Sequence, residues 1–235
     1  LSGSYALAKK RLNSIQARLK GLPLVKQKYA DFIREYEELE HMKKTENHGQ
    51  ASYYIPHHSV VKETSLTTKL RVVFDASMPT ASGLSLNQVL YTGPKLQANI
   101  IELIIRFRTY RVAFKTDLCK MFRQILIRPE DRKFQHILWQ ADNNDPVVDY
   151  ELQTVTYGTG SAPFLANRTL KQLIMDEGHD FSEATRRVIN EETYIDDSLS
   201  GGDSVDEAIQ IRDEMIDILN RGHFSPRQWA SSHPE

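Results

Sequence analysis

The sequence has a single cysteine, Cys119, and no long run of apolar residues. One cysteine excludes an internal disulfide and favours an intracellular setting, because disulfide-stapled folds belong to oxidising compartments. No apolar stretch has the roughly 20 residues that a membrane-spanning helix needs, and no signal-peptide pattern opens the chain, so we expect no membrane partner. Internal repeats and low-complexity segments are also lacking.

The composition, with 40% hydrophobic and 26% charged residues, is typical of a soluble globular protein. A chain of 235 residues can bury a substantial core, enough for one large domain or two small ones. The chain begins at Leu1 rather than Met, so we expect a fragment of a longer product.

The net charge of −1 hides an uneven distribution of charge. Residues 100–124 are mostly basic, and residues 176–217 are strongly acidic. Residues 1–28 contain no acid and seven basic side chains: Lys9, Lys10, Arg11, Arg18, Lys20, Lys26 and Lys28. Such asymmetry permits a basic groove for nucleic acid beside an acidic, metal-demanding centre, although a basic run is also typical of a solvated helix face.

Apolar residues at helical spacing predict a helix over 4–20 and a second one ending near Leu39, and a loop signal at 47–50 closes this helical lead-in. From Tyr53 onward the pattern predicts strands over 53–62, 67–75, 110–117, 134–140 and 150–157. Helices are predicted over 95–108, 163–178, 185–190 and 204–222. Strands and helices without a regular βαβ rhythm predict an α+β fold with helices on one face of a sheet.

Residues 192–201 predict a tight hairpin, because short apolar or β-branched stretches flank Asp196-Asp197 and glycines follow. Both carboxylates would lie at its tip. Taken alone, the pair favours a solvated polar turn. A site for divalent metal ions needs a third carboxylate from elsewhere in the chain.

Asp117 supplies that third carboxylate, because it ends the apolar strand predicted over 110–117. If this strand lies beside the hairpin, Asp117, Asp196 and Asp197 converge, and their repulsion raises each pKa unless cations neutralise them. Ligands that are all oxygen select Mg²⁺, or Mn²⁺ in its place. Two such ions about 4 Å apart can activate a 3′-hydroxyl and stabilise a leaving pyrophosphate.

Other residues fit the same chemistry. Lys69 and Arg71 on one strand offer charges for a triphosphate. Gly158-Thr159-Gly160 lets the backbone approach a base or sugar closely. Phe122, five residues after Asp117, places an aromatic ring near a bound sugar, although plain core packing is the ordinary role of such a ring.

Three features favour structural roles instead. Asp75 fits a strand end better than a ligand set, because isolated motif matches often mislead. His57-His58 has no third metal ligand at a compatible spacing. Cys119 lies next to Leu118 in the chain and fits a small buried filler better than a reactive thiol.

The motifs resemble those of reverse transcriptases. Tyr194-Ile195-Asp196-Asp197 resembles their tyrosine-x-aspartate-aspartate box. Asp117 with Phe122 resembles the first-carboxylate motif, in which an aromatic ring excludes ribonucleotides by blocking the 2′-hydroxyl. Residues 69–75 resemble the fingers strand that holds the incoming triphosphate, and residues 157–164 resemble the loop and helix that line the nucleotide pocket. The order and spacing match over residues 53–230.

A finer resemblance is to the Bel/Pao group of long-terminal-repeat retrotransposons, carried by residues 54–58, 71–77 and 224–231. It implies that residues 1–49 are a helical spacer after the protease of a Pol polyprotein. It implies that residues 50–235 are the fingers and palm of a right-hand polymerase. The palm would be a ferredoxin-like sheet with helices on one face, and the thumb, connection and ribonuclease H would be absent.

The resemblance also implies an activity and its partners. The protein would be an RNA-directed DNA polymerase that adds deoxynucleoside triphosphates to a primer on an RNA or DNA template, with two Mg²⁺ ions. Its polyprotein would also carry protease, ribonuclease H and integrase, and it would act in the cytoplasm or within virus-like particles. The implied metal ligands are Asp117, Asp196, Asp197 and the backbone carbonyl of Leu118. The implied nucleotide contacts are Arg71, Lys69 or Lys62, Leu118, Phe122, Tyr157 and Gly158.

Four positions depart from the family's pattern. Ser198 replaces an apolar residue, which predicts looser packing under the hairpin, and Gly160 replaces a larger residue, which predicts a reshaped nucleotide pocket. Gln228 and Ser232 stand where lysine and asparagine are common. No metal ligand is lost. The alternative function is a degenerate, non-catalytic fragment that still binds nucleic acid.

Overall fold

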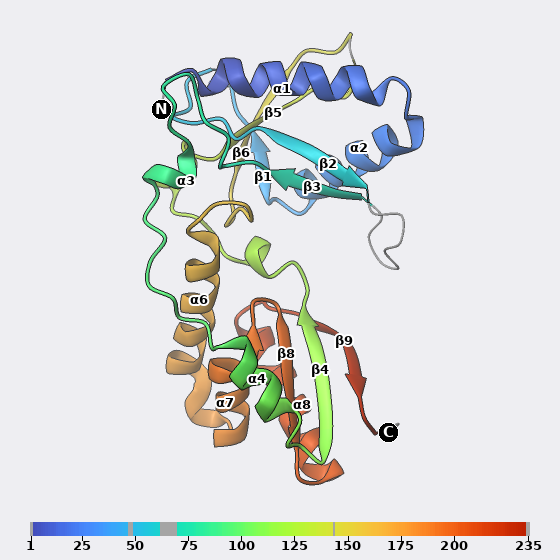
Figure 1. The fold of residues 1–235 in the computed structure, drawn as a ribbon, viewed down its shortest axis with the longest axis vertical. Helices are drawn as coiled ribbons and strands as arrows, with labels where there is room; N and C mark the ends of the chain where they lie inside the picture. The colour runs from blue at the N-terminus through green and yellow to red at the C-terminus, as the bar shows by residue number, and fades with distance from the viewer. Residues whose placement is uncertain (1, 47–48, 62–69, 143, 234–235) are drawn as a thin grey trace. The chain divides into compact units, whose positions relative to one another are not determined.

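The computed structural model describes residues 2–46, 49–61, 70–142 and 144–233 (Figure 1). The chain divides into two compact units. The first comprises Leu1–Thr92 and Leu126–Ala162, and the second comprises Gly93–Ile125 and Pro163–Glu235. No described helix is both long and apolar enough to cross a lipid bilayer.

The first unit combines helices with two small antiparallel sheets, ordered β1-β6-β5 and β2-β3. Its helices are α1 (Ser4–Leu19), α2 (Pro23–Glu38), α3 (Leu86–Val89) and α5 (Pro129–Arg132). Its strands are β1 (Met42–Lys44), β2 (His57–Val61), β3 (Leu70–Phe74), β5 (His136–Trp139) and β6 (Val148–Leu152). The strand predicted over 67–75 is thus β3, and its residues 67–69 lie outside the described part of the chain.

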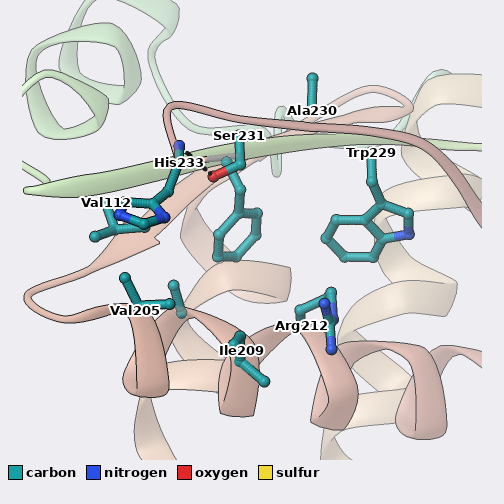
Figure 2. Close-up of a pocket in the computed structure, with 10 residues that line it drawn as sticks. Val112, Val205, Ile209, Arg212, Trp229, Ala230, Ser231 and His233 are labelled. Atoms are coloured by element: carbon teal, nitrogen blue, oxygen red, sulfur yellow. Dashed lines mark hydrogen bonds between the residues drawn. The ribbon is translucent and has the colours of Figure 1, made fainter. Parts of the chain in front are cut away.

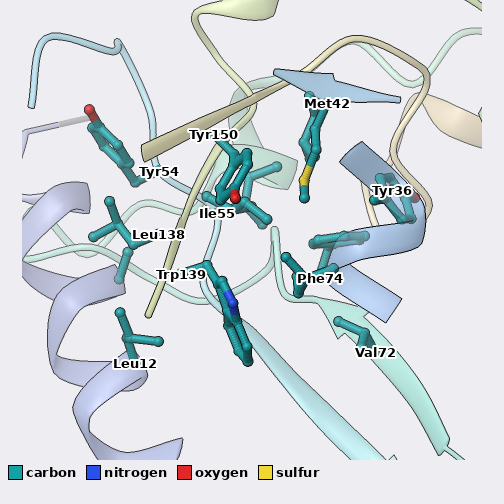
Figure 3. Packing of buried hydrophobic residues seen from close by; sticks show 14 of the residues in the cluster. Leu12, Tyr36, Met42, Tyr54, Ile55, Val72, Phe74, Leu138, Trp139 and Tyr150 are labelled. Atoms are coloured by element: carbon teal, nitrogen blue, oxygen red, sulfur yellow. The ribbon is translucent and has the colours of Figure 1, made fainter. Parts of the chain in front are cut away.

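The helical lead-in is part of the first unit's core. α1 buries Leu12, Ile15 and Leu19, which recur at helical spacing, and α2 buries Tyr29, Ile33 and Tyr36. Figure 3 shows Leu12 and Tyr36 in the same cluster as Trp139 of β5 and Phe74 of β3. The chain's division into units does not fall at residue 49, and the predicted limits of spacer and polymerase in the sequence stay a prediction.

The second unit is built on a four-stranded antiparallel sheet ordered β7-β8-β4-β9. These strands are β4 (Val112–Leu118), β7 (Thr193–Tyr194), β8 (Asp197–Gly202) and β9 (Pro226–Ser231). The helices are α4 (Ile100–Phe107), η1 (Met121–Gln124), α6 (Ala162–Glu177), η2 (Gly178–Asp180), α7 (Glu183–Glu191) and α8 (Val205–Arg221). Apolar residues of α6, α7 and α8 pack with β4 into one core, so the predicted α+β fold is confirmed.

The structure corrects two local predictions. The helix predicted over 95–108 begins only at Ile100, and in α4 Leu103 is buried while Ile104 is 45% exposed. Ile101 and Ile105 of the same helix are also exposed, at 64% and 60%. No helix was predicted between residues 75 and 95, but Ser85 and Gln88 form a capping box that starts α3.

His57 lies in the core of the first unit as a neutral ring. Its Nε2 donates to the carbonyl oxygen of Leu138 at 2.8 Å, so Nδ1 is the acceptor, and the Tyr29 hydroxyl donates to it. Burial lowers the pKa of His57 from 6.5 to about 4, a fall that the Leu138 hydrogen bond opposes and that the neighbouring His58 adds to. Protonation of His57 therefore requires the core to accept an unfavourable charge.

We predict that acid destabilises the fold through His57. The unfolded chain binds this proton below pH 6.5 and the folded chain only near pH 4, so stability present above pH 6.5 is lost as pH falls toward 4. The pKa difference corresponds to about 3 kcal/mol in the free energy of unfolding. Urea denaturation of wild type and His57→Gln at several pH values measures it.

The His57→Gln variant should be less stable than wild type at pH 7 but lose about 3 kcal/mol less between pH 7 and 4. His179→Gln is the control, because His179 is a surface residue with an exposed side chain. Equal acid sensitivity of wild type and His57→Gln would contradict the assignment.

Candidate active site

The predicted hairpin is confirmed. Thr193 pairs with Ser198 and Tyr194 with Asp197, so Ile195 and Asp196 form a two-residue turn and Asp197 begins β8. Ile195 has a φ of 56°, the left-handed region that a β-branched side chain rarely adopts. A residue held there costs about 1–3 kcal/mol, so the surrounding contacts over-determine the turn.

β4 brings the third carboxylate to this hairpin. Asp117 is the direct cross-strand partner of Asp197, and the next residue, Leu118, donates its amide to the carbonyl oxygen of Asp196 at 2.7 Å. The pairing of β4 with β9 shifts register between Lys115 and Asp117, an irregularity of the kind that re-aims side chains at sheet edges. The ladder thus places the three predicted carboxylates in adjoining positions.

The carboxylates repel one another. The pKa of Asp117 is raised, first by burial and then by the charges of Asp196 and Asp197, while Lys115 lowers it. Like charges directly opposite on two strands destabilise a sheet, and a divalent cation removes that repulsion. Carboxylates and a backbone carbonyl are the oxygen donors that Mg²⁺ and Mn²⁺ prefer, so the donor set fits these ions.

The carboxylates do not form a finished metal cage. Across the described residues there is no group of three His, Cys, Asp or Glu side chains placed to hold a metal ion. This finding covers His57-His58 as well as the carboxylates at the hairpin. Mg²⁺ binding by Asp117, Asp196, Asp197 and the Leu118 carbonyl therefore stays a prediction.

The prediction of loose packing at Ser198 is wrong. Ser198 is 1% exposed, and its hydroxyl hydrogen-bonds across the hairpin to that of Thr193 at 2.9 Å. The Thr193 hydroxyl also donates to the carbonyl of Val188 in α7 at 3.1 Å. A polar residue at this buried position is tolerated because its partner is another buried hydroxyl.

A buried carboxylate that sequence reasoning missed anchors the base of the hairpin. Glu192 is 1% exposed, and one of its oxygens accepts from the Tyr110 hydroxyl at 2.6 Å and from Arg187 Nε at 3.2 Å. Arg106 of α4 lies 3.5 Å from the same oxygen, and the Glu192 carbonyl accepts from the Leu199 amide at 2.9 Å. The two arginines in the basic and acidic segments carried no sequence signal that they would meet here.

The sugar-gate role of Phe122 and the metal-binding role of the Leu118 carbonyl both stay predictions. Phe122 lies in η1 and is partly buried against the core of the second unit. Leu118 as a whole is 2% exposed.

The other nucleotide-contact candidates belong to the first unit. Arg71 is exposed on β3, opposite Val60 of β2. Tyr157 donates its hydroxyl to the Val72 carbonyl at 2.9 Å and packs its ring 5.1 Å from that of Phe74. Lys69 and Lys62 lie outside the described residues. Convergence of these residues with the carboxylates on one nucleotide stays a prediction.

The small-residue loop is fixed to α3 by Asn87, a second residue that sequence reasoning missed. Its side-chain amide donates to the Gly158 carbonyl at 2.9 Å, and its oxygen accepts from the Gly160 amide at 2.7 Å. Gly158 has a φ of 96°, and a Cβ there would lie 2.2 Å from the Phe74 carbonyl oxygen. The Ser85-x-x-Gln88 capping signature could have revealed the helix that carries Asn87.

A cavity of about 240 Å³ in the second unit lies away from the carboxylates. Figure 2 shows Val205, Ile209 and Arg212 of α8 facing Trp229 of β9 across it. On β4 it reaches Val112 and Phe114, at the end of the strand opposite Asp117. It is a gap between sheet and helix, and its position gives it no part in the chemistry of the hairpin.

No protein-family model and no curated protein matches the sequence. The fold does match solved structures. The chain is similar to a selenomethionine-labelled CSH mutant of prototype foamy virus protease-reverse transcriptase, with a TM-score of 0.64, 17% identity, and coverage of 87% of this chain and 23% of that one. It is also similar to a foamy viral protease-reverse transcriptase dRH in complex with double-stranded DNA, with a TM-score of 0.61 and 14% identity. That match covers 81% of this chain and 28% of the other. The native prototype foamy virus protease-reverse transcriptase matches with a TM-score of 0.60 and 16% identity, over 83% of this chain and 22% of the other.

These similarities show the fold, which is reverse-transcriptase-like. The chain spans about a quarter of the length of the proteins it matches. At this level of identity a shared fold does not carry a shared function, because functions are grafted onto folds through particular residues. The activity is therefore argued below from the hairpin.

We predict that the Thr193–Ser198 hydrogen bond stabilises the hairpin. Ser198→Ala should lower the free energy of unfolding by about 1 kcal/mol, because a buried hydrogen bond is lost. A double-mutant cycle with Thr193→Val, measured by urea denaturation, isolates the pair. A coupling free energy near zero would show that the two hydroxyls do not interact.

Proposed function

We propose that this chain is the fingers and palm of an RNA-directed DNA polymerase. The observation that carries the proposal is the register of β4 and β8, which sets Asp117 opposite Asp197 beside the Ile195-Asp196 turn. The reverse-transcriptase-like fold supports it. The substrates would be deoxynucleoside triphosphates and a primer on an RNA or DNA template.

Each residue has a role in this proposal. Asp117, Asp196, Asp197 and the Leu118 carbonyl would hold two Mg²⁺ ions, which when bound activate the primer 3′-hydroxyl and stabilise the leaving pyrophosphate. The exposed guanidinium of Arg71 would bind triphosphate oxygens, which its planar fork suits, with Lys69 as helper. Phe122 would exclude ribonucleotides, and Tyr157 and Gly158 would line the nucleotide pocket. The Glu192 cluster would hold the carboxylates in position through the hairpin.

We further propose a Bel/Pao-type retrotransposon Pol polyprotein as the source, on the strength of the residues that resemble that group. Protease, ribonuclease H and integrase would be its neighbours in the polyprotein. The protein would act in the cytoplasm or in virus-like particles. One of the matched foamy viral proteins is seen with double-stranded DNA, which supports a nucleic-acid partner here.

A second candidate is a non-catalytic fragment that binds nucleic acid. The observation that favours it is that no three metal-ligating side chains already converge among the described residues. Retention of all three carboxylates favours catalysis. A metal ion can draw acidic side chains together when it binds, because it removes their repulsion.

We predict primer extension that depends on Mg²⁺ and on Asp196. With oligo(dT) on poly(rA), the folded chain should incorporate dTMP, and Asp196→Asn should reduce the rate at least about 100-fold by removing charge that holds the metal. Incorporation is measured by gel electrophoresis of a labelled primer. Mg²⁺ should also raise the melting temperature of wild type more than that of Asp196→Asn.

The matched control is Asp203→Asn, because Asp203 is an exposed acid beyond β8 and makes the same change in charge. It should keep the wild-type rate. Absence of Mg²⁺-dependent incorporation by the folded chain, or equal rates for Asp196→Asn and Asp203→Asn, would refute the polymerase and leave the non-catalytic candidate.

We predict that Phe122 discriminates against ribonucleotides. Phe122→Ala should raise the ratio of rUTP to dTTP incorporation about 10- to 100-fold, because removing a steric contact of this size changes discrimination by about 1–3 kcal/mol. Single-nucleotide extension measures the ratio. Phe122→Tyr keeps the ring and should keep the discrimination, and circular dichroism checks that both variants fold. An unchanged ratio in a folded Phe122→Ala variant would assign Phe122 to the core alone.

A further inference from the structure

One side of α1 has a row of basic residues beside β2. The helix buries Ala8, Leu12 and Leu19 and packs along β2 and β5. Arg11 and Arg18 are seven residues apart, so they lie on one flank of the helix about 10 Å from each other along its axis. Lys10 is exposed next to that flank.

The helix that carries this flank packs against β2 of the β2-β3 sheet. The charges of Arg11 and Arg18 both lower the pKa of His58 on that strand, after the larger effect of burial, while Asp75 raises it. Val60 is opposite Arg71, and His58 is two residues from Val60, which puts His58 and Arg71 on one face of the sheet. Lys10, Arg11, Arg18 and Arg71 are called the α1–β2 basic face below, and the neutral ring of His58 lies on the same face of the sheet as Arg71.

Within the described part of the chain this positive charge has no ion-paired acid. Among the described residues no acid forms an ion pair with Lys10, Arg11, Arg18 or Arg71. Asp75 raises the pKa of His58, and residues 2–30 contain no acid. Some other surface cations are paired, such as Lys26 with Asp142 and Arg34 with Asp31. Uncompensated charge of one sign on two elements attracts a polyanion.

We propose that the α1–β2 basic face binds the sugar-phosphate backbone of single-stranded nucleic acid. Guanidiniums bind phosphate oxygens through paired hydrogen bonds, and two of them about 10 Å apart along a straight helix can follow a strand. Exposed Val60 and the half-buried Val73 lie between the charges on β2-β3 and offer apolar surface to unstacked bases. The face contacts backbone and carries no base-specific readout.

The proposal extends the proposed function, since the strand would be the template, but binding does not require polymerisation. It is tested by fluorescence anisotropy with a labelled poly(rU) 20-mer, without nucleotide and with EDTA, over 50–300 mM KCl. The variant is Arg11→Gln with Arg18→Gln. The control is Lys9→Gln with Lys20→Gln, which removes the same charge from exposed residues on the other flank of α1.

We expect the Arg11/Arg18 pair of substitutions to weaken binding about tenfold at 0.1 M KCl. It should also reduce the slope of log K against log salt by about 1.4, because each phosphate neutralised on a single strand contributes about 0.7. The Lys9/Lys20 control should stay close to wild type in both its affinity for the RNA and the slope of log K against log salt. Arg11→Lys with Arg18→Lys keeps both charges and should keep the slope, which separates charge from any structural role of the guanidiniums.

Equal losses in the two glutamine variants would overturn the proposal, because they would indicate only net charge. Binding to vesicles of phosphatidylcholine and phosphatidylserine with the Arg11/Arg18 dependence, and none to the RNA, would overturn it in favour of a membrane surface. If primer extension is absent but the Arg11/Arg18 effect on RNA binding remains, the proposed polymerase fails and the basic face stands.

Discussion

The repulsion between Asp117 and Asp197, held opposite each other by the β4-β8 ladder, is the constraint on which the second unit depends. Backbone hydrogen bonds fix the two strands regardless of the charges they carry, and the raised pKa of Asp117 records the resulting cost. Such a cost is retained where it serves a function, since functional sites store electrostatic strain that the rest of the fold supports. The ladder makes a site that a divalent cation would stabilise.

The rest of the second unit opposes that repulsion. The Ile195 turn is itself strained, so the hairpin carries two unfavourable features within three residues. Glu192 ties its base to Tyr110 and Arg187, and the buried Ser198–Thr193 pair closes it from within. These contacts satisfy one carboxylate oxygen of Glu192 and the hydroxyls of Thr193 and Ser198, whereas the other Glu192 oxygen is buried without a hydrogen-bond partner among the described residues.

The first unit uses a different principle. Its core includes buried residues of α1 and α2, so the helical lead-in stabilises the first unit. The same packing places α1, with its basic flank, against β2. Asn87 holds the small-residue loop, in which only a glycine fits at position 158 because a Cβ would clash with the Phe74 carbonyl oxygen. Core packing on one side of an element thereby sets the charge presented on the other.

The sequence by itself determined the α+β class, the hairpin, and the three carboxylates, because periodicity, turn residues and motif order are local properties. Only the tertiary structure decided what depends on distant residues. It showed that Ser198 is satisfied by Thr193, that Ile104 of α4 stays exposed, and that Glu192 gathers arginines from α4 and α7. Register and burial set those contacts, and neither can be read from neighbours in the chain.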